Sequence, residues 1–305
     1  MDLRQIRYFV AACEEGSLSA AAARLHCTPS GVSQQMSALE ARLGIGLLER
    51  TRRGVNPTAA GWRFYNRCLA VLTSVSEAQM ELEDFSAGLS GSVSAGFAPG
   101  LAKSVLPAAL ARYTLEYPRV DIEIGSGTAD TLVAGTSAGT LDFYVGQYAK
   151  PQVGLSATPI GRFPVALISG ARCGFAPMEP IRLHEVAPLK LSVPSATHSL
   201  RPRIEEAVRN GEISVERTIT IASLSAGLEF VAQTDWSSIL PFWIGLKELG
   251  NERVTVNPVA DPHLSVELAL IHLAQRPLTR PSRHLYEHFR QELQRCEEEW
   301  RRITH

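Results

Sequence analysis

The segment from Ser17 to Gly44 constrains the fold of this chain more than any other stretch. It reads SLSAAAARLHCTPSGVSQQMSALEARLG and predicts two short helices joined by a tight turn. Thr28 can cap the second helix through its hydroxyl, and Pro29 suits the first helical position, where no backbone N–H needs a partner. Apolar residues then recur at steps of four, three and four, which predicts one buried stripe. The stripe comprises Val32, Met36, Leu39 and Leu43.

The opposite face of the second helix is predicted to be polar, with no negative charge before Glu40. Its residues are Thr28, Pro29, Ser30, Ser33, Gln34, Ser37 and Arg42, with Gln35 at the flank. Such hydrogen-bonding side chains are what a helix needs to read base edges in the major groove of DNA. An ordinary helical pair in a core is the alternative. The missing carboxylates and the basic segment that follows favour DNA binding.

Charge is distributed unevenly along the chain. Residues 1–66 hold eight arginines against five acidic residues, a net +3, while the rest of the chain holds 22 basic and 26 acidic residues. A positive end on a nearly neutral chain indicates a polyanionic partner for that end.

The residues from Leu47 to Thr58 predict a β-hairpin, or wing, after the helix pair. Gly54 permits its turn, and Arg52 and Arg53 lie where they can straddle phosphates or enter a minor groove. A solvated run of charges is the alternative. Beside this helix pair, contact with the DNA backbone is the favoured interpretation.

The first sixty residues resemble the N-terminal winged helix-turn-helix of LysR-type transcriptional regulators, without a gap. They read MDLRQIRYFVAACEEGSLSAAAARLHCTPSGVSQQMSALEARLGIGLLERTRRGVNPTAAG. Pro29-Ser30 stands where Gln-Pro is frequent in the family, and Gln34 where Arg is frequent, which affects the bases that are read. The resemblance implies a DNA-binding domain over residues 1–60 and a regulator of double-stranded promoter or operator DNA. It also implies a homodimer or homotetramer, an interrupted palindromic site and a contact with RNA polymerase.

A long helix is expected from Thr58 to about Ala87, and the sequence Gly88-Leu89-Ser90-Gly91 ends it. Its larger side chains step by three and four, a narrow stripe that suits a partner helix. The stripe comprises Trp62, Tyr65, Leu69, Leu72, Val75, Gln79 and Leu82. Residues 58–90 are therefore predicted to form a linker and dimerisation helix. A helix folded back on its own domain is the alternative.

Strands and helices alternate over residues 91–305, which predicts parallel sheets covered by helices, with one helix over Ala102–Glu116. Two runs of this alternation predict two lobes, lobe I at about 91–161 and 266–305 and lobe II at about 162–265. The stretches GSVSAGFAP, YPRVDIEIGSGTADTLVAGTSAGTLDFYVG and SSILP resemble the effector-binding domain of the same family. The resemblance implies a type 2 periplasmic-binding-protein fold, so the expected class is multidomain α and α/β.

Loops beyond the carboxyl ends of parallel strands are where such sheets bind ligands. The residues expected to contact an effector are Pro99, Gly100, Leu101, Ala102, Gly127, Thr128, Ser195, Thr197, His198 and Ser223, with Phe242 and Trp243 as an apolar wall. Backbone amides, hydroxyls and a cationic His198 or Arg201 suit a carboxylate, so an organic or aromatic acid is expected. Alternatives are an uncharged or apolar ligand, helix capping by each Ser or Thr, and lobe packing by the aromatic pair.

Two motifs look catalytic but lack the context that their chemistry requires. Gly135–Gly139 matches G-x-S-x-G, yet a nucleophile needs a strand before the serine and a helix after it, and here that order is reversed. His284–His288 matches H-x-x-E-H on the final helix, where a third zinc ligand is not evident. The sequence therefore predicts no enzyme activity, no metal and no cofactor.

Localisation and redox state follow from what the sequence contains. No apolar run reaches membrane-spanning length, and the opening Met1-Asp2-Leu3-Arg4 has no apolar signal core, so a cytoplasmic protein without a membrane partner is expected. The cysteines at 13, 27, 68, 173 and 296 form no Cys-x-x-Cys pair and are expected to be reduced thiols. A constitutive DNA-binding protein without effector remains an alternative, as does an enzyme or transport-binding protein with a fused head.

Overall fold

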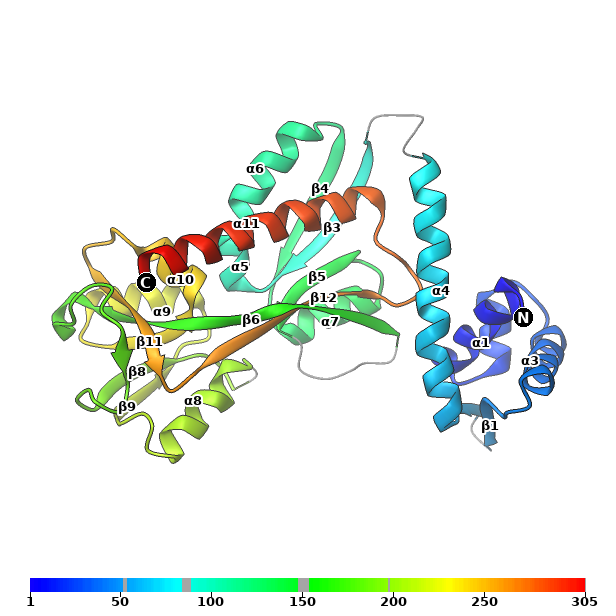
Figure 1. Cartoon of the computed structure of the whole chain (residues 1–305), viewed down its shortest axis with the longest axis horizontal. Coiled ribbons are helices and arrows are strands. Elements are labelled where there is room, and N and C mark those ends of the chain that lie inside the picture. Colours follow the sequence, from blue (N-terminus) through cyan, green and yellow to red (C-terminus); the bar gives the residue numbers. More distant parts are fainter. Residues whose placement is uncertain (52–53, 84–88, 148–153, 197, 305) are drawn as a thin grey trace. The chain divides into compact units, whose positions relative to one another are not determined.

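The computed structural model describes residues 1–51, 54–83, 89–147, 154–196 and 198–304, with side chains of residues 73 and 76–83 outside the description. It forms two compact units. One holds Met1–Gly88 and the short segment Leu273–Pro277, and the other holds most of the chain from Leu89 onward (Figure 1). We call the described residues from Met1 to Glu83 the head, and we call the second unit the effector unit.

The head consists of three short helices, a two-stranded hairpin and a long helix. Their bounds are α1 Leu3–Glu15, α2 Leu18–Arg24, α3 Pro29–Leu43, β1 Leu48–Thr51, β2 Gly54–Pro57 and α4 Ala59–Glu83. Side chains cap the three short helices: Asp2 accepts from the Gln5 amide, Ser17 from that of Ala20 and Thr28 from that of Gly31. These caps satisfy N–H groups that would otherwise lack a partner, which is why each helix begins where it does.

The core of the head is built between α1, α3 and α4. Phe9, Met36 and Leu39 are buried in it, as the stripe on α3 predicted for the last two. Leu43, the fourth predicted member, is instead 40% exposed, because α3 ends there and Gly44 turns the chain in the left-handed conformation.

The first half of α4 packs on its own head. Tyr65 and Cys68 are buried in the head core, and Leu69 and Leu72 pack against it, whereas Trp62 is 39% exposed. This half therefore contacts its own head, as in the folded-back alternative, while dimerisation through α4 stays a prediction. The side chains of Gln79 and Leu82 lie outside the described residues.

The effector unit is built on a mixed sheet with the strand order β4-β3-β5-β12-β6-β10-β8-β9, and β11 pairs with β6. The bounds are β3 Gly91–Phe97, β4 Val120–Ser126, β5 Phe143–Gln147, β6 Leu155–Gly170, β8 Leu189–Val193, β9 Val215–Thr220, β10 Ser237–Pro241, β11 Val254–Asp261 and β12 Ser265–Leu273, with a short β7 at Ile181–Arg182. Strand β3 runs parallel to β4 and β5, and β8 runs parallel to β9 and β10, as expected for two α/β lobes.

Two antiparallel strands join these parallel groups. Strand β12 pairs with β5, and the second half of β6 pairs with β10 and β11. Within the described part, β6 continues without a break for 16 residues, through the boundary expected at about residues 161 and 162 between the two lobes. Only the last residues of β6 form a continuous buried run. An apolar run in the sequence therefore indicates the second half of the strand but not its more exposed first half.

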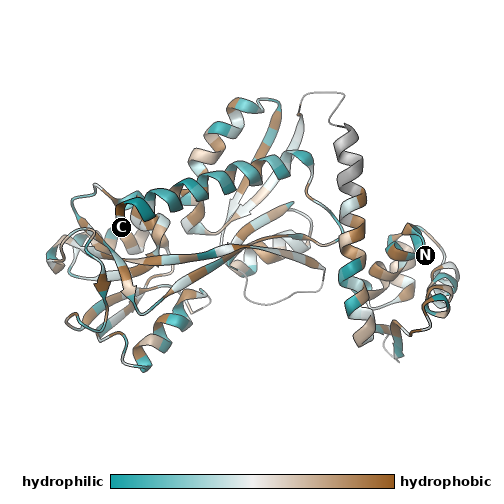
Figure 2. Ribbon diagram, viewed as in Figure 1, coloured by the Kyte–Doolittle hydropathy of each residue, from teal (hydrophilic) through white to brown (hydrophobic). Residues whose placement is uncertain are grey.

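The helices of the effector unit cover the sheet. They are α5 Pro99–Ser104, α6 Leu106–Glu116, α7 Ala129–Ser137, α8 Leu200–Arg209, α9 Leu224–Gln233, α10 Phe242–Glu248 and α11 Arg280–Thr304, with a 3-10 turn at Ala171–Cys173. The single helix expected over Ala102–Glu116 is two helices that divide at Val105, and Pro107 lies in the first turn of the second, where proline is tolerated. Figure 2 shows that α11 is mostly hydrophilic, because only one stripe of it, including Leu285 and Phe289, enters the core.

No helix in the described part of the chain combines the length and apolar character needed to cross a membrane.

Candidate functional site

The N-terminal half of α3 presents an uncharged polar surface. Thr28, Pro29, Ser30 and Gln34 are exposed on it, and Ser33 and Gln35 are half-buried. The Thr28 Oγ1 accepts from the Gly31 amide at 3.2 Å, so the cap that begins the helix also fixes the edge of this surface. The predicted DNA-contacting residues of α3 thus share one end of one helix.

Two of these residues are held from within the head. The guanidinium of Arg50 on β1 donates to the Ser33 Oγ at 3.1 Å, and the Gln5 side-chain amide donates to the Gln35 Oε1 at 3.0 Å. An exposed cation therefore lies directly beside the polar face of α3. The two other arginines assigned to DNA, Arg52 and Arg53, lie outside the described residues.

Glu40 has a role that sequence reasoning missed. Its Oε1 accepts from the backbone amides of Leu47 and Leu48 at 2.7 and 3.0 Å. The carboxylate that ends the uncharged run on α3 therefore turns toward the backbone at the start of the hairpin and fixes its position. The sequence carries only a weak signal for this contact, because many glutamates lie seven or eight residues before the start of a strand without binding its backbone amides.

The hairpin is also docked on the end of α1. The Val55 amide donates to the Gly16 carbonyl at 2.8 Å, and a Cβ added at Gly54 would lie 2.1 Å from that same oxygen. Gly54 also has a φ of +136°. Only glycine fits both restraints, so the turn predicted at Gly54 is required by packing as well as by conformation.

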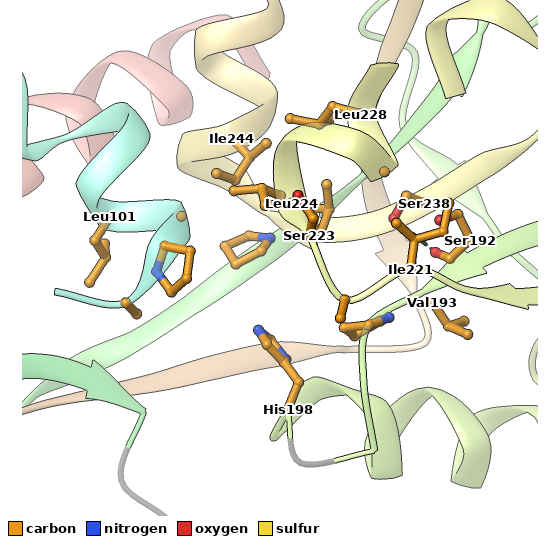
Figure 3. A pocket seen from close by; sticks show the side chains of 18 of the residues that line it. Leu101, Ser192, Val193, His198, Ile221, Ser223, Leu224, Leu228, Ser238 and Ile244 are labelled. Atoms are coloured by element: carbon orange, nitrogen blue, oxygen red, sulfur yellow. Dashed lines mark hydrogen bonds between the residues drawn. The ribbon is translucent and has the colours of Figure 1, made fainter. Parts of the chain in front are cut away.

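A pocket opens in the effector unit at the ends of several strands. Its empty volume is about 750 Å³, including the space open to solvent at its mouth. The described residues that line it are Ala98, Pro99, Gly100, Leu101, Gln147, Ser192, Val193, Pro194, His198, Ile221, Ala222, Ser223, Leu224, Gly227, Leu228, Ser238, Leu240, Pro241, Trp243, Ile244 and Leu268. Figure 3 shows side chains from α5, from the loop before α8 and from α9 and α10 converging on it.

The pocket brings together only some of the predicted ligand contacts. Pro99, Gly100, Leu101, His198 and Ser223 line it. Ala102, Gly127, Thr128 and Ser195 are not among its lining residues, and Thr197 lies outside the described residues.

Phe242 differs from the prediction, whereas its neighbour Trp243 lines the pocket. Phe242 is fully buried, with its ring 6.1 Å from that of Phe163 and 5.9 Å from that of Trp300. Successive residues of a helix point in directions about 100° apart, so the two aromatics at the start of α10 cannot both face the pocket. The sequence pattern alone did not show which one would.

Capping accounts for part of the hydroxyl chemistry that the sequence suggested. Thr128 Oγ1 accepts from the Thr131 amide at 3.3 Å, and Ser223 Oγ accepts from the Ala226 amide at 3.3 Å. Thr128 therefore matches the capping alternative, and Ser223 caps α9 while lining the pocket.

Neither expected cation provides a positive charge inside the pocket. The Nδ1 of His198 accepts from the Leu200 amide at 3.2 Å, which requires that nitrogen to be unprotonated, and burial lowers the pKa of the imidazole. Arg201 pairs with Glu205 at 2.5 Å and donates to the Pro194 carbonyl and the Thr220 hydroxyl. Burial and the bond from the Leu200 amide both disfavour the protonated form of His198, so they do not support it as a cationic anchor.

Sequence reasoning missed most of the apolar wall. Ile221, Leu224, Leu228, Leu240, Ile244 and Leu268 line the pocket from five different elements or loops. Each looks like an ordinary core residue in its own segment, so no local sequence signal separates pocket wall from core.

The two catalytic-looking motifs have structural explanations. Ser137 ends α7 and precedes β5, the reverse of the order that an activated serine needs. His288 contacts the Glu116 carboxylate at 3.0 Å through Nε2 and the His284 carbonyl at 2.8 Å through Nδ1. Within the described residues no three His, Cys, Asp or Glu side chains gather so that they could hold a metal ion.

Comparison with known proteins places both units in one family. Residues 3–62 match the model of the bacterial regulatory helix-turn-helix protein, lysR family, and residues 86–294 match that of the LysR substrate binding domain. The chain belongs to the LysR family of bacterial regulatory proteins. It is a DNA-binding transcriptional regulator with an effector-binding domain, a class of regulators rather than enzymes.

Individual relatives agree with this. The chain is 29% identical to the nitrogen assimilation regulatory protein nac of Escherichia coli (strain K12) over 271 residues, 88% of either chain. It is 32% identical to the HTH-type transcriptional regulator ClcR of Pseudomonas putida over 155 residues, 51% of this chain and 53% of ClcR.

Solved structures share the fold of the full chain. Full-length CbnR complexed with its target DNA matches with a TM-score of 0.57 at 23% identity, covering 96% of this chain and 99% of CbnR. Full-length BenM matches with a TM-score of 0.57 at 21% identity and covers 98% of each chain.

Proposed function

We propose that this regulator reads its operator through the N-terminal half of α3. The observation that carries the proposal is the uncharged polar face of Thr28, Ser30 and Gln34, with the exposed Arg50 bound to Ser33 beside it. Amide and hydroxyl groups suit base edges, and an adjacent guanidinium suits a phosphate. Arg52 and Arg53 are assigned to the DNA backbone from the sequence alone.

We propose that the three segments of the chain have the separate functions expected from the sequence. Residues 1–60 bind DNA, residues 58–90 link and dimerise, and residues 91–305 bind the effector in two lobes, about 91–161 with 266–305 and about 162–265. We further propose a homodimer or homotetramer, because two heads related by symmetry fit an interrupted palindrome with two half-sites. Contact with RNA polymerase is proposed from the family resemblance.

A small organic molecule in the effector-unit pocket is proposed as the regulating ligand. Converging loops and a mostly apolar wall support it, since such concave sites hold most small ligands of proteins. The sequence led us to expect an organic or aromatic acid, and the apolar wall supports only the apolar body of such a ligand. The alternative is a constitutive DNA-binding protein, whose operator affinity would not respond to any ligand.

The experiment begins with DNA selected by the purified full-length protein from a library of random duplexes. Fluorescence anisotropy then compares the selected duplex with a scrambled duplex of the same composition at fixed salt. Preference for the selected duplex is expected, and equal affinity for both would contradict sequence-specific reading. Adding a ligand that raises the melting temperature should then change operator affinity or the footprint, because ligand binding shifts the balance of conformations.

A further inference from the structure

The described wall of the effector-unit pocket carries no fixed charge. Among the described residues that line it, none is Asp, Glu, Lys or Arg. Its polar side chains are those of Gln147, Ser192, His198, Ser223 and Ser238. An ionised ligand would therefore find no oppositely charged side chain on the described wall.

Most of the polar groups are already used by the protein. Ser238 Oγ donates to the Ser192 carbonyl at 2.9 Å, Ser223 Oγ caps α9, and Gln147 Oε1 accepts from the hydroxyl of Ser199. The surface left for a ligand is mainly aliphatic and aromatic, formed by residues such as Leu101, Ile221 and Leu228, which Figure 3 shows around the cavity.

One buried donor at the pocket has no partner. Trp243 is 3% exposed, and its Nε1 is buried without a hydrogen-bond acceptor in the described structure. A Cβ added at Gly100, another lining residue, would lie 3.2 Å from this nitrogen, so the indole N–H is beside the space that glycine leaves open. A buried donor without an acceptor is costly, and a ligand oxygen would remove that cost.

His198 supplies a second neutral donor. Its ring points into the pocket (Figure 3), and Nδ1 accepts from the Leu200 amide at 3.2 Å. The ring proton of the neutral imidazole therefore sits on Nε2. Both unassigned groups are thus uncharged N–H donors, one on α10 and one just before α8.

These features favour a neutral ligand over an anion. Moving an ionised carboxylate into an apolar site without a cation carries a large desolvation cost, whereas a carbonyl oxygen is desolvated far more cheaply and can accept from an N–H group. We propose that the effector is an uncharged organic molecule with an apolar body and a hydrogen-bond acceptor, such as an aromatic ketone, ester or lactone. This rests on the effector binding proposed above and replaces the acid expected from the sequence with an uncharged ligand.

Matched pairs of probes test the ligand class on the full-length protein at pH 7.5. Methyl cinnamate is compared with cinnamate, and methyl 1-naphthoate with 1-naphthoate, by thermal shift and by titration calorimetry. The expected result is that each ester raises the melting temperature and binds at least about tenfold tighter than its carboxylate. Equal or tighter binding of the carboxylates would overturn the proposal.

A tryptophan variant tests the donor. Trp243→Phe keeps an aromatic ring and removes the N–H, so ester affinity should fall roughly twofold to tenfold. Trp236→Phe is the matched control, because Trp236 is not among the lining residues, and it should leave ester affinity unchanged. Unchanged ester binding by Trp243→Phe, with wild-type thermal stability, would remove the indole from the site.

Operator binding separates this inference from the proposed function. If neither member of any pair stabilises the protein while the selected operator is bound normally, the ligand class is wrong and the DNA function stands. If the selected operator is also not preferred over the scrambled duplex, the proposed function fails as well.

Discussion

The guanidinium of Arg50 donates to the hydroxyl of Ser33 at 3.1 Å, which joins the first strand of the hairpin to the polar face of α3. Ser33 was expected to read DNA directly. In the structure it also holds the exposed arginine next to that face, so one hydroxyl can orient a proposed phosphate contact while lying among the side chains proposed to read bases.

The first prediction tests that pair. Arg50→Ala should reduce the slope of log affinity against log salt by about 1, because one phosphate contact is lost. Ser33→Ala should weaken specific binding more than non-specific binding. Arg302→Ala, an exposed arginine at the end of α11, is the control and should leave the slope unchanged. An unchanged slope in Arg50→Ala would exclude Arg50 from the phosphate contacts.

The second prediction concerns base reading by Gln34, which is exposed near the start of α3. Gln34→Ala should cost about 1–3 kcal/mol of discrimination between selected and scrambled duplex, the usual contribution of a bidentate amide–base pair. Gln35→Ala should cost less, because its oxygen already accepts from Gln5. Anisotropy on both duplexes measures this, and equal losses on the two would argue against base reading.

The third prediction uses glycine to map the pocket. In Gly100→Ala the new methyl group would lie 3.2 Å from Ile244 Cδ1 and from Trp243 Nε1, so it narrows the pocket and should lower ligand affinity several-fold. Gly127→Ala alters a predicted contact that does not line the pocket, so this variant should bind the ligand normally. Its new Cβ would lie at an ordinary van der Waals distance, 3.4 Å from Thr131, so the fold should tolerate it. Calorimetry on both variants decides which loop contacts the ligand.

The fourth prediction is a pH dependence from His198, whose pKa burial lowers below its unfolded value. Below the unfolded pKa of about 6.5 the unfolded chain binds a proton that the folded chain does not, so stability is lost as the pH falls from there toward the folded pKa. His198→Gln should flatten this acid limb in urea melts. His263→Gln, on an exposed residue, is the control and should retain it.

The fifth prediction concerns the attachment of α4 to the head. The Tyr65 hydroxyl donates to Glu14 Oε1 at 2.7 Å, and Arg24 pairs with the other oxygen of Glu14 at 2.9 Å. Tyr65→Phe leaves a nearly buried carboxylate oxygen without this donor and should destabilise the head by about 1–3 kcal/mol. Glu14→Gln in the same background should recover part of the loss, and additive losses in the double-mutant cycle would show that the two side chains are not coupled.

The sequence predicted best where a local rule determines the structure. The cap at Thr28, proline at the first position of α3 and the turn at Gly54 each depend on neighbouring residues or on one backbone conformation. The alternation of strands and helices after residue 91 likewise indicated the α/β fold, although it did not show the break at Val105.

The pocket was less predictable, because its walls depend on residues far apart in the chain. Phe242 and Trp243 are adjacent aromatic residues, and only the orientation of α10 places one in the core and the other at the pocket. His198 looked like a cation until the Leu200 amide was found to donate to its ring. Side-chain types alone therefore did not show whether a charged group faces the ligand.

The uninterrupted strand β6 joins the two lobes and restrains how one could move against the other. The same 16 residues pair with β12 on the lobe I side and with β10 and β11 in lobe II. Bending such a strand sharply would break interstrand hydrogen bonds, whereas changing its twist keeps them. Ligand binding in the pocket would then rotate one lobe against the other through a small angle by twisting β6, and the strand would regain its original twist when the ligand leaves.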